Sequence, residues 1–198
     1  TAAAILGLDA ALCVFTGRVE NDSVLYKDSG NIVLNTLFGA TLYPTPWKGD
    51  RNGPIEALAD KLRGEGRKPF VVPYGVSNAM GALSYSSVIA EIAAQMAADN
   101  ITPRAIIAAS GSGGTQGGVT LGVQACLPET AAICIDVDAD AARVTADASR
   151  YAGEAAALLG YDFNPDGIRL ETGYEGDGYG VIAPSTVEAM TLCARLEG

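Results

Sequence analysis

A glycine-rich run that also carries hydroxyl side chains is the part of this sequence best suited to bind an anion. The run Ala108-Ala-Ser-Gly-Ser-Gly-Gly-Thr-Gln-Gly-Gly118 directly follows an apolar strand candidate and opens a helical pattern that reaches Cys126. Glycines let successive backbone N–H groups converge, and the N-terminus of a helix adds the positive end of its dipole. A phosphate group satisfies such donors. The residues expected to bind it are Gly111, Ser112, Gly113, Gly114 and Thr115.

The common nucleotide-binding motifs do not fit this run. Gly111-x-Gly113-x-x-Gln116 lacks the third glycine of the dinucleotide fingerprint, and no Gly-Lys-Ser/Thr sequence follows to make a Walker A loop. A dinucleotide-binding domain also carries an acidic residue at the end of its next strand. Asp136 and Asp138 stand at that place, so this feature alone does not exclude a nucleotide-dependent oxidoreductase. A glycine-rich turn without any ligand is the other alternative.

A second loop carries polar side chains that could contact a substrate. The loop Pro73-Tyr-Gly-Val-Ser-Asn-Ala-Met-Gly81 follows a strand candidate, at the end of a sheet where open α/β folds bind their ligands. Ser77 and Asn78 could act there or could cap the helix expected over Gly81–Ala98. From the loop alone, capping is the stronger interpretation, because serine and asparagine are favoured at helix N-termini.

The chain contains no histidine, which excludes Ser-His-Asp and Cys-His catalysis by its own residues. Proton transfer would then depend on another side chain. The loop Gly173-Tyr-Glu-Gly-Asp-Gly-Tyr-Gly-Val181 sets tyrosines between glycines, so that the backbone rather than packing positions them. The Tyr179 hydroxyl could donate or accept a proton in such a site. A solvent-facing tyrosine is equally compatible with the sequence.

Composition and charge narrow the class of protein. The chain has 198 residues, of which 48% are hydrophobic, and its 23 acidic and 13 basic residues give a formal net charge of -10. A nucleic-acid-binding surface needs clustered cations, so we expect no nucleic-acid partner. We also expect no membrane contact, because no apolar run reaches the roughly 20 residues of a membrane span. Its four cysteines lie among apolar residues without a Cys-x-x-Cys pair, which favours free thiols in the cytoplasm.

Short β-branched runs alternate with longer helical patterns along the chain. The expected strands are Ala10–Thr16, Thr41–Tyr43, Pro69–Val72, Arg104–Ala109, Ala131–Val137 and Ile168–Glu171. The expected helices are Asn31–Phe38, Pro54–Glu65, Gly81–Ala98, Gly118–Cys126, Ala139–Leu159 and Ser185–Leu196. Continuously hydrophobic strands are typical of parallel sheets that are covered on both faces, so the pattern predicts an α/β fold with parallel sheets. Thr1–Gly7 has the pattern of the last turns of a helix, and we expect the chain to be a piece of a longer protein.

Four spaced motifs occur in the same order as in a known family. Lys68-Pro-Phe-Val-Val-Pro-Tyr-Gly-Val-Ser-Asn-Ala-Met-Gly-Ala-Leu is similar to a strand and a Gly-Gly-Ser-Asn loop, and Ser110–Gly118 is similar to a phosphate loop. Gly30–Ala40 resembles a helix of that family. Gly178-Tyr-Gly-Val, followed by Glu188-Ala-Met-Thr-Leu-Cys-Ala-Arg-Leu-Glu-Gly, resembles its later segment. Together they cover essentially the whole chain and resemble the family of D-cysteine desulfhydrases and 1-aminocyclopropane-1-carboxylate (ACC) deaminases.

The resemblance implies a fold, a cofactor and a domain organisation. It implies an α/β enzyme of the tryptophan-synthase β fold that uses pyridoxal 5'-phosphate on a small amino acid. Residues 1–76 would belong to a smaller lobe and residues 77–198 to a larger, cofactor-binding lobe, with the site between them. We also expect a homodimer. The family's Schiff-base lysine lies in a segment that would precede Thr1, so these residues alone would be inactive.

The resemblance also implies roles for individual residues. Gly111–Thr115 would bind the cofactor phosphate, Ser77 and Asn78 would lie on the substrate side, and Tyr179 would act in proton transfer or positioning. We expect β-elimination from D-cysteine that yields pyruvate, ammonia and sulfide. ACC and L-cysteate remain open as substrates, and an inactive fragment that binds a phosphate ligand is the alternative of another class. We expect Gly113→Val to weaken cofactor binding far more than it lowers stability.

The sequence departs from the family pattern at two positions. Val76 replaces the second glycine of the Gly-Gly-Ser-Asn loop, which would shift its backbone, and Ile182 replaces the proline of Tyr-Gly-Val-Pro. None of the lysines lies in the family's lysine motif, and all are expected in loops or on charged helix faces. These lysines are Lys27, Lys48, Lys61 and Lys68.

Overall fold

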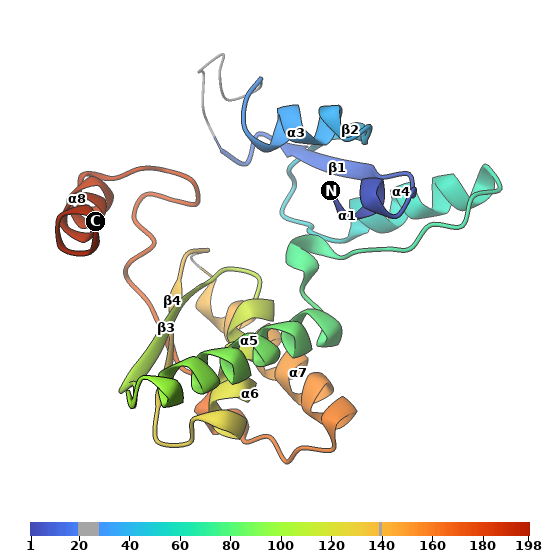
Figure 1. The fold of residues 1–198 in the computed structure, drawn as a ribbon. Coiled ribbons are helices and arrows are strands. Elements are labelled where there is room, and N and C mark those ends of the chain that lie inside the picture. Colours follow the sequence, from blue (N-terminus) through green and yellow to red (C-terminus); the bar gives the residue numbers. More distant parts are fainter. Residues whose placement is uncertain (20–27, 139) are drawn as a thin grey trace. The chain divides into compact units, whose positions relative to one another are not determined.

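The chain forms two compact units built on parallel strands (Figure 1). The computed structural model describes three stretches, residues 1–19, 28–138 and 140–198. Unit 1 is Thr1–Val72 and unit 2 is Pro73–Gly198, whereas the sequence analysis placed the boundary at residue 76. All described strand pairs are parallel, which confirms the α/β class. Lys27 and Ala139, the first residue of an expected helix, lie outside the described residues.

Unit 1 contains a two-stranded parallel sheet. Its elements are α1 (Ala2–Ile5), β1 (Ala11–Thr16), α3 (Asn31–Leu37), β2 (Thr41–Pro46) and α4 (Gly53–Gly64). Strands β1 and β2 pair from Ala11 opposite Thr41 to Thr16 opposite Pro46. Strand β2 continues beyond Tyr43, where the sequence predicted its end. Each strand of a two-stranded sheet has an open edge, and a proline there does not remove a ladder hydrogen bond.

The segment Pro69–Val72 is not the strand that the sequence predicted. It has no assigned secondary structure, and the Phe70 side chain is 91% exposed. An apolar, β-branched sequence favours extended backbone, but a strand forms only where a second strand accepts and donates its hydrogen bonds. Within the described residues no strand pairs with this segment, which is therefore an extended connection at the end of unit 1.

Unit 2 contains a three-stranded parallel sheet in the order β3-β4-β5, with helices packed beside it. Its elements are η1 (Tyr74–Val76), α5 (Ala79–Ala98), β3 (Ala105–Ser110), α6 (Gly114–Cys126), β4 (Ala131–Asp136), α7 (Ala141–Leu159), η2 (Pro165–Gly167), β5 (Leu170–Glu171) and α8 (Pro184–Glu197). Helix α6 packs against both α5 and α7. The buried apolar residues of this packing include Leu121 and Val119 of α6 and Ile89 of α5.

Glycines on one face of α6 let the backbone of α5 approach closely. Gly114, Gly118 and Gly122 lie one helical turn apart, so they share this face. A Cβ atom on Gly118 would lie 2.2 Å from the carbonyl oxygen of Ala82, and one on Gly114 would lie 2.7 Å from Ser77 Oγ. Both distances are too short for real atoms, so only glycine is compatible with this packing.

A second face of α6 makes an equally close contact with α7. A Cβ atom on Gly113 would lie 2.8 Å from Ala148 N, and one on Gly117 would lie 2.7 Å from Ala148 O. Helix α6 begins at Gly114, a full turn before the expected start at Gly118. Glycine has a low intrinsic helix propensity, which hides this turn in the sequence. Packing between α5 and α7 stabilises the turn despite that propensity.

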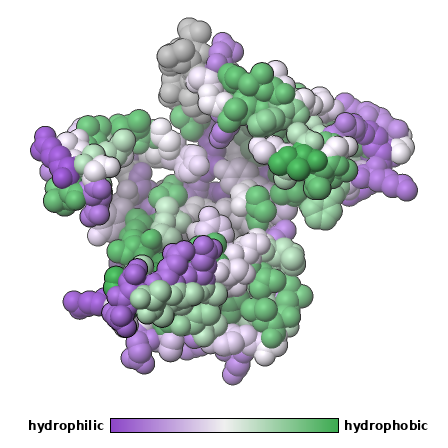
Figure 2. All heavy atoms as spheres, in the orientation of Figure 1, coloured by the Kyte–Doolittle hydropathy of each residue, from purple (hydrophilic) through white to green (hydrophobic). Residues whose placement is uncertain are grey.

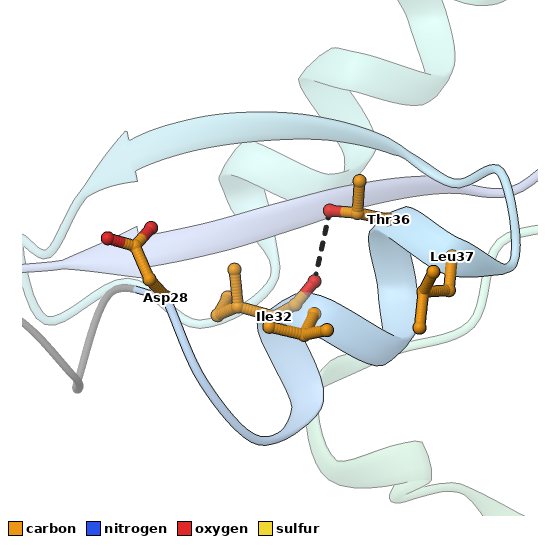
Figure 3. A pocket seen from close by; sticks show the side chains of 5 residues that line it. Asp28, Ile32, Thr36 and Leu37 are labelled. Atoms are coloured by element: carbon orange, nitrogen blue, oxygen red, sulfur yellow. Dashed lines mark hydrogen bonds between the residues drawn. The ribbon is translucent and has the colours of Figure 1, made fainter.

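Apolar side chains also remain on the surface of the described residues (Figure 2). On α8 they are Val187, Met190, Leu192 and Leu196. A shallow pocket of about 210 Å³ lies along α3 and is lined mostly by apolar side chains (Figure 3). Its Thr36 hydroxyl donates to the Ile32 carbonyl at 3.1 Å, so the helix itself uses this polar group. None of the described helices is both long and apolar enough to cross a membrane.

Candidate functional site

The N-terminus of α6 presents a group of backbone donors directly after β3. The loop turns through Gly113, whose φ of 83° is left-handed, and the helix begins at Gly114. The first helical hydrogen bond runs from Gly117 N–H to the Gly113 carbonyl at 2.9 Å. Within the described residues no oxygen accepts the N–H groups of Gly114, Thr115 or Gln116. These three donors and the helix dipole form a geometry that suits an anion.

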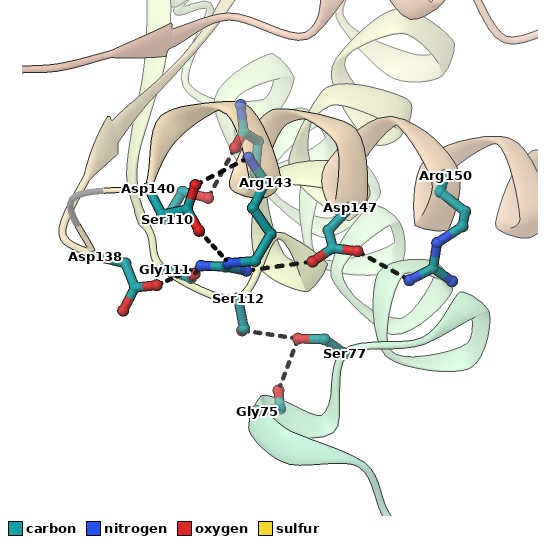
Figure 4. A network of polar contacts seen from close by, with 11 residues as sticks. Gly75, Ser77, Ser110, Gly111, Ser112, Asp138, Asp140, Arg143, Asp147 and Arg150 are labelled. Atoms are coloured by element: carbon teal, nitrogen blue, oxygen red, sulfur yellow. Dashed lines mark hydrogen bonds and ion pairs between the residues drawn. The ribbon is translucent and has the colours of Figure 1, made fainter. Parts of the chain in front are cut away.

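A pair of serine hydroxyls joins this loop to the loop that precedes α5. Ser77 Oγ donates to Ser112 Oγ at 2.7 Å, and Ser77 is only 4% exposed (Figure 4). Because Ser112 Oγ accepts this bond, its own proton is available to a ligand. A Cβ atom on Gly75 would lie 2.5 Å from Ser112 Oγ, so the glycine makes room for the pair. Ser77 thus lies beside the predicted phosphate loop.

Asn78 serves as the N-cap of α5. Its Oδ1 atom accepts the Gly81 N–H at 2.8 Å, while its backbone is extended with φ of -158°. The capping interpretation that the sequence favoured is confirmed. Contact of Ser77 or Asn78 with a substrate stays a prediction. The Ser77 hydroxyl is bonded to Ser112, and the Asn78 amide oxygen is used by the cap.

Val76 keeps a left-handed backbone although it is β-branched. Its φ is 55°, and the preceding Gly75 has φ of 67°. The resemblance to the family implies a glycine at this position, and glycine adopts this conformation without a Cβ penalty. A left-handed conformation costs other residues roughly 1–2 kcal/mol. The loop therefore holds the valine in a conformation suited to glycine. A shift of its backbone relative to the family stays a prediction.

The Gln116 side chain connects the glycine loop to the neighbouring strands by hydrogen bonds. It is completely buried at 0% exposure; Ser110 Oγ donates to its Oε1 at 2.8 Å, and its Nε2 donates to the Arg169 carbonyl at 3.3 Å. These bonds join the end of β3, the first turn of α6 and the residue before β5. In the sequence, Gln116 stands out only as the residue in place of the third glycine of the dinucleotide fingerprint. Its signal was a long polar amide in the first turn of a helix made mostly of glycine and apolar residues.

Arg143 is a second residue that the sequence analysis did not identify. It lies in the first turn of α7, and its Nη2 donates to the Gly111 carbonyl at 3.0 Å (Figure 4). The same guanidinium faces three carboxylates. Nη2 also donates to Asp138, Nε donates to Asp140 at 3.1 Å, and Nη1 donates to Asp147 at 3.2 Å. The segment after β4 and the start of α7 are thereby tied to the glycine loop.

Tyr179 lies in the loop between β5 and α8. Its side chain is 51% exposed, and the neighbouring Ile182 is 71% exposed. Earlier in this loop, Glu175 accepts the Gly173 N–H at 2.8 Å, and backbone hydrogen bonds lower the pKa of that carboxyl. The contacts described for residues 111–115 come from α5, α7 and the loops before them. Its role in proton transfer stays a prediction.

The residues at the α6 N-terminus fit the phosphate of pyridoxal phosphate. The donors are backbone N–H groups and one hydroxyl, which are the groups that hold phosphate in helix N-terminal sites. A metal site and a reactive thiol have less support in unit 2. Among the described residues no three His, Cys, Asp or Glu side chains are placed to hold a metal ion. Burial raises the pKa of the Cys134 thiol to about 11, so it stays protonated at neutral pH.

The three described lysines are exposed, and all of them precede the glycine loop in the sequence by more than 40 residues. Lys61 lies on α4, 4.0 Å from Glu65 and over the ring of Tyr43, while Lys48 and Lys68 lie in loops. This confirms, for these three, the expectation of loops and charged helix faces. Unit 2 contains no lysine in its sequence.

Comparison with known proteins identifies the family. The whole chain, residues 1–198, matches the family of pyridoxal-phosphate dependent enzymes. The chain belongs to this family, and the resemblance drawn from the four motifs is confirmed.

Individual relatives narrow the similarity further. The D-cysteine desulfhydrase of Yersinia enterocolitica is 35% identical over 196 residues, which are 99% of this chain and 59% of that protein. The D-cysteine desulfhydrase of Yersinia pestis is 33% identical over the same share of both chains. The crystal structure of an ACC deaminase homologue superimposes with a TM-score of 0.80 at 28% identity and covers 100% of this chain and 57% of that one. The chain thus spans 59% of the length of these curated relatives.

Proposed function

We propose that the loop before α6 binds the phosphate of pyridoxal 5'-phosphate. The observation that carries this proposal is the group of N–H donors at Gly114, Thr115 and Gln116, which no oxygen accepts within the described residues. The Ser112 hydroxyl lies in the same loop and keeps its proton free. Membership of a pyridoxal-phosphate dependent family supports this choice of anion.

The residues of this chain would bind and orient the cofactor. When bound, pyridoxal phosphate supplies an electron sink for negative charge at the α-carbon of an amino acid. The N–H groups of Gly114–Gln116 would hold the phosphate, and Ser112 would donate a further hydrogen bond. The buried Ser77 would keep the Ser112 hydroxyl in place. Tyr179 would hold or move a proton at its phenolic oxygen, since the chain has no histidine.

We propose that the protein acts on a small amino acid, with D-cysteine as the first candidate. The support is the 33–35% identity to D-cysteine desulfhydrases over 99% of the chain. Elimination of the thiol and hydrolysis would convert D-cysteine and water into pyruvate, ammonia and hydrogen sulfide. ACC is the second candidate, because the superimposed crystal structure is that of an ACC deaminase homologue. L-Cysteate remains a third.

The phosphate site is tested by removing the Ser112 hydroxyl. We expect Ser112→Ala to weaken the binding of pyridoxal phosphate roughly tenfold, because a hydrogen bond to a charged group contributes about 1.5–3 kcal/mol. Binding is measured by equilibrium titration of the cofactor absorbance. The matched control is Ser84→Ala, because the exposed Ser84 hydroxyl bonds the Met80 carbonyl within α5, away from the glycine loop. Equal affinity of Ser112→Ala and the wild type would contradict the proposal.

The role of Tyr179 is tested separately. In the protein that contains this chain and turns over D-cysteine, we expect Tyr179→Phe to reduce turnover and leave the cofactor content unchanged. The change removes only the hydroxyl. Lower turnover at full cofactor content would therefore show that this hydroxyl transfers a proton or positions the substrate. Unchanged turnover would show that Tyr179 has no part in the reaction.

An inactive phosphate-binding piece is the second candidate function. It is favoured by the exposure of Lys48, Lys61 and Lys68 and by the absence of lysine from the sequence of unit 2. Covalent pyridoxal-phosphate catalysis needs a lysine amine at the cofactor aldehyde. We expect these 198 residues to form no specific adduct when mixed with the cofactor and reduced with borohydride. A single stoichiometric label on one lysine, together with turnover of D-cysteine, would exclude this candidate.

A further inference from the structure

We infer that Arg143 is a positioning residue of the phosphate loop, which orients the Gly111–Ser112 peptide so that its N–H faces the bound anion. The inference rests on the proposed function, and it assigns a role to a residue of α7 that does not itself touch the anion. Local sequence gives no sign of this role, because Arg143 lies 32 positions along the chain from Gly111.

The direction of one peptide group carries the argument. Arg143 Nη2 donates to the Gly111 carbonyl at 3.0 Å. The peptide is trans, so its carbonyl and the N–H of Ser112 point to opposite sides. Holding the carbonyl toward α7 therefore turns the Ser112 N–H away from α7. No oxygen of the described residues accepts this N–H, which leaves it as a fourth donor beside those of Gly114, Thr115 and Gln116.

The charges around Arg143 show that it acts through position rather than as a phosphate-binding cation. Its guanidinium donates to Asp138, Asp140 and Asp147, so three carboxylates surround a single positive charge. Asp138 is itself deeply buried, with a side chain 4% exposed, while that of Arg143 is 27% exposed. A positive charge compensated in this way adds little attraction for a distant anion, but its fixed fork of donors holds several acceptors in place.

The backbone of α7 anchors the arginine at its other end. Asp140 caps the helix by accepting the Arg143 N–H at 3.3 Å, so the residue is held through main chain and side chain together. The next turn of α7 lies against Gly113, with Ala148 N 2.8 Å from the position of a Cβ atom there. Helix α7 thus contacts the loop at two points, by a hydrogen bond at Gly111 and by packing at Gly113.

The experiment compares pyridoxal phosphate with pyridoxal, which lacks the phosphate. The ratio of their dissociation constants measures the contribution of the phosphate and does not depend on turnover. We expect Arg143→Ala to lower this preference roughly tenfold, since about 1.4 kcal/mol corresponds to a factor of ten. Arg150→Ala is the matched control, because Arg150 also pairs with Asp147, at 3.0 Å, and its other ion pair is with Glu154 on α7. This control should keep the wild-type preference.

Arg143→Lys separates positioning from general stability. Lysine keeps the positive charge among the carboxylates, but a single ammonium lacks the fork that reaches Asp138 and the Gly111 carbonyl together. We expect Arg143→Lys to recover most of the unfolding free energy lost in Arg143→Ala but little of the preference for pyridoxal phosphate.

Each outcome has a defined meaning. A wild-type preference in either Arg143→Ala or Arg143→Lys would overturn the inference, and Arg143→Lys decides the question if Arg143→Ala does not fold. An equal loss in Arg150→Ala would also overturn it, because the effect would then be one of α7 stability. If the wild-type protein itself binds both compounds equally, the proposed phosphate site fails, which is a different result from failure of the arginine alone.

Discussion

Two segments of unit 2 are rich in glycine for different physical reasons. In residues 113–122 the glycines give room, since a Cβ atom on Gly118 would lie 2.2 Å from the Ala82 carbonyl oxygen. In residues 173–180 the glycines give backbone freedom. Gly173 has φ of 86° and Gly178 has φ of 142°, yet a Cβ atom on Gly173 would meet no atom within 4 Å. Similar composition therefore reflects helix packing in one segment and loop conformation in the other.

The difference bears on how each segment could act. The packed glycines hold the first turn of α6 between two helices, so the N–H donors at its start have a defined direction. The tyrosine loop is more open, since Tyr179 is 51% exposed and a Cβ atom on Gly173 would meet nothing within 4 Å. A phosphate anchor requires donors that are already oriented, whereas a proton carrier in an exposed loop depends on what packs against it. The substitutions below test the comparison, from the largest expected effect to the smallest.

Gly113→Val should have the largest effect on stability. It combines a β-branched side chain at φ of 83° with a Cβ atom 2.8 Å from Ala148 N. We expect a loss of roughly 2–5 kcal/mol of unfolding free energy, from about 1–2 for the left-handed backbone and about 1–3 for overpacking. Urea denaturation measures it. This loss of stability adds to the weaker cofactor binding expected from the sequence, so Ser112→Ala is the better probe of the site.

Gly118→Ala tests packing without backbone strain. Gly118 is helical, so alanine would gain helix propensity, but its methyl group would collide with Ala82 O and with Tyr85 Cβ at 2.5 Å. We expect a net destabilisation of about 2–3 kcal/mol by urea denaturation. Gly153→Ala in α7 is the matched control, because a Cβ atom there meets nothing within 4 Å. A Gly118→Ala protein as stable as the wild type would show that α5 and α6 are not in such close contact.

Gly173→Ala tests the loop glycines in the same way. Its φ of 86° penalises a side chain, although the space around it is open. We expect a loss of about 1 kcal/mol, which is the cost of the left-handed backbone alone. Thermal denaturation of Gly173→Ala and Gly118→Ala in parallel gives the comparison. A larger loss at Gly173 than at Gly118 would reverse the distinction between the two segments.

Val76→Asn should have the smallest effect and the opposite sign. Asparagine tolerates the left-handed region much better than a β-branched residue, and Val76 is 57% exposed, so little buried contact is lost. We expect a gain of about 0.5–1 kcal/mol in unfolding free energy. Val88→Asn on α5, 43% exposed at a helical position, is the control and should show no gain. A destabilised Val76→Asn would show that the valine side chain has a packing role.

Much of the fold and part of the site could be predicted from local sequence. The strands β1, β3 and β4 and the long helices α5 and α7 appear near their expected bounds, because hydrophobic period and capping residues are local signals. Asn78 is an example, since its capping bond to Gly81 N–H spans only three residues. The glycine loop between β3 and α6 was recognisable for the same reason.

The tertiary structure decided features that depend on residues far apart in the chain. Pro69–Val72 has a strand-like sequence but lacks a partner strand among the described residues. Helix α6 begins a turn early because α5 and α7 pack against its glycines. Arg143 meets the Gly111 carbonyl only after α7 has packed beside α6. The sequence by itself determined most of the strands and helices, the family motifs and the place of the glycine loop. Long-range packing decided which glycines allow close contact between helices. It also decided which N–H groups at the start of α6 stay free and which side chains orient the loop.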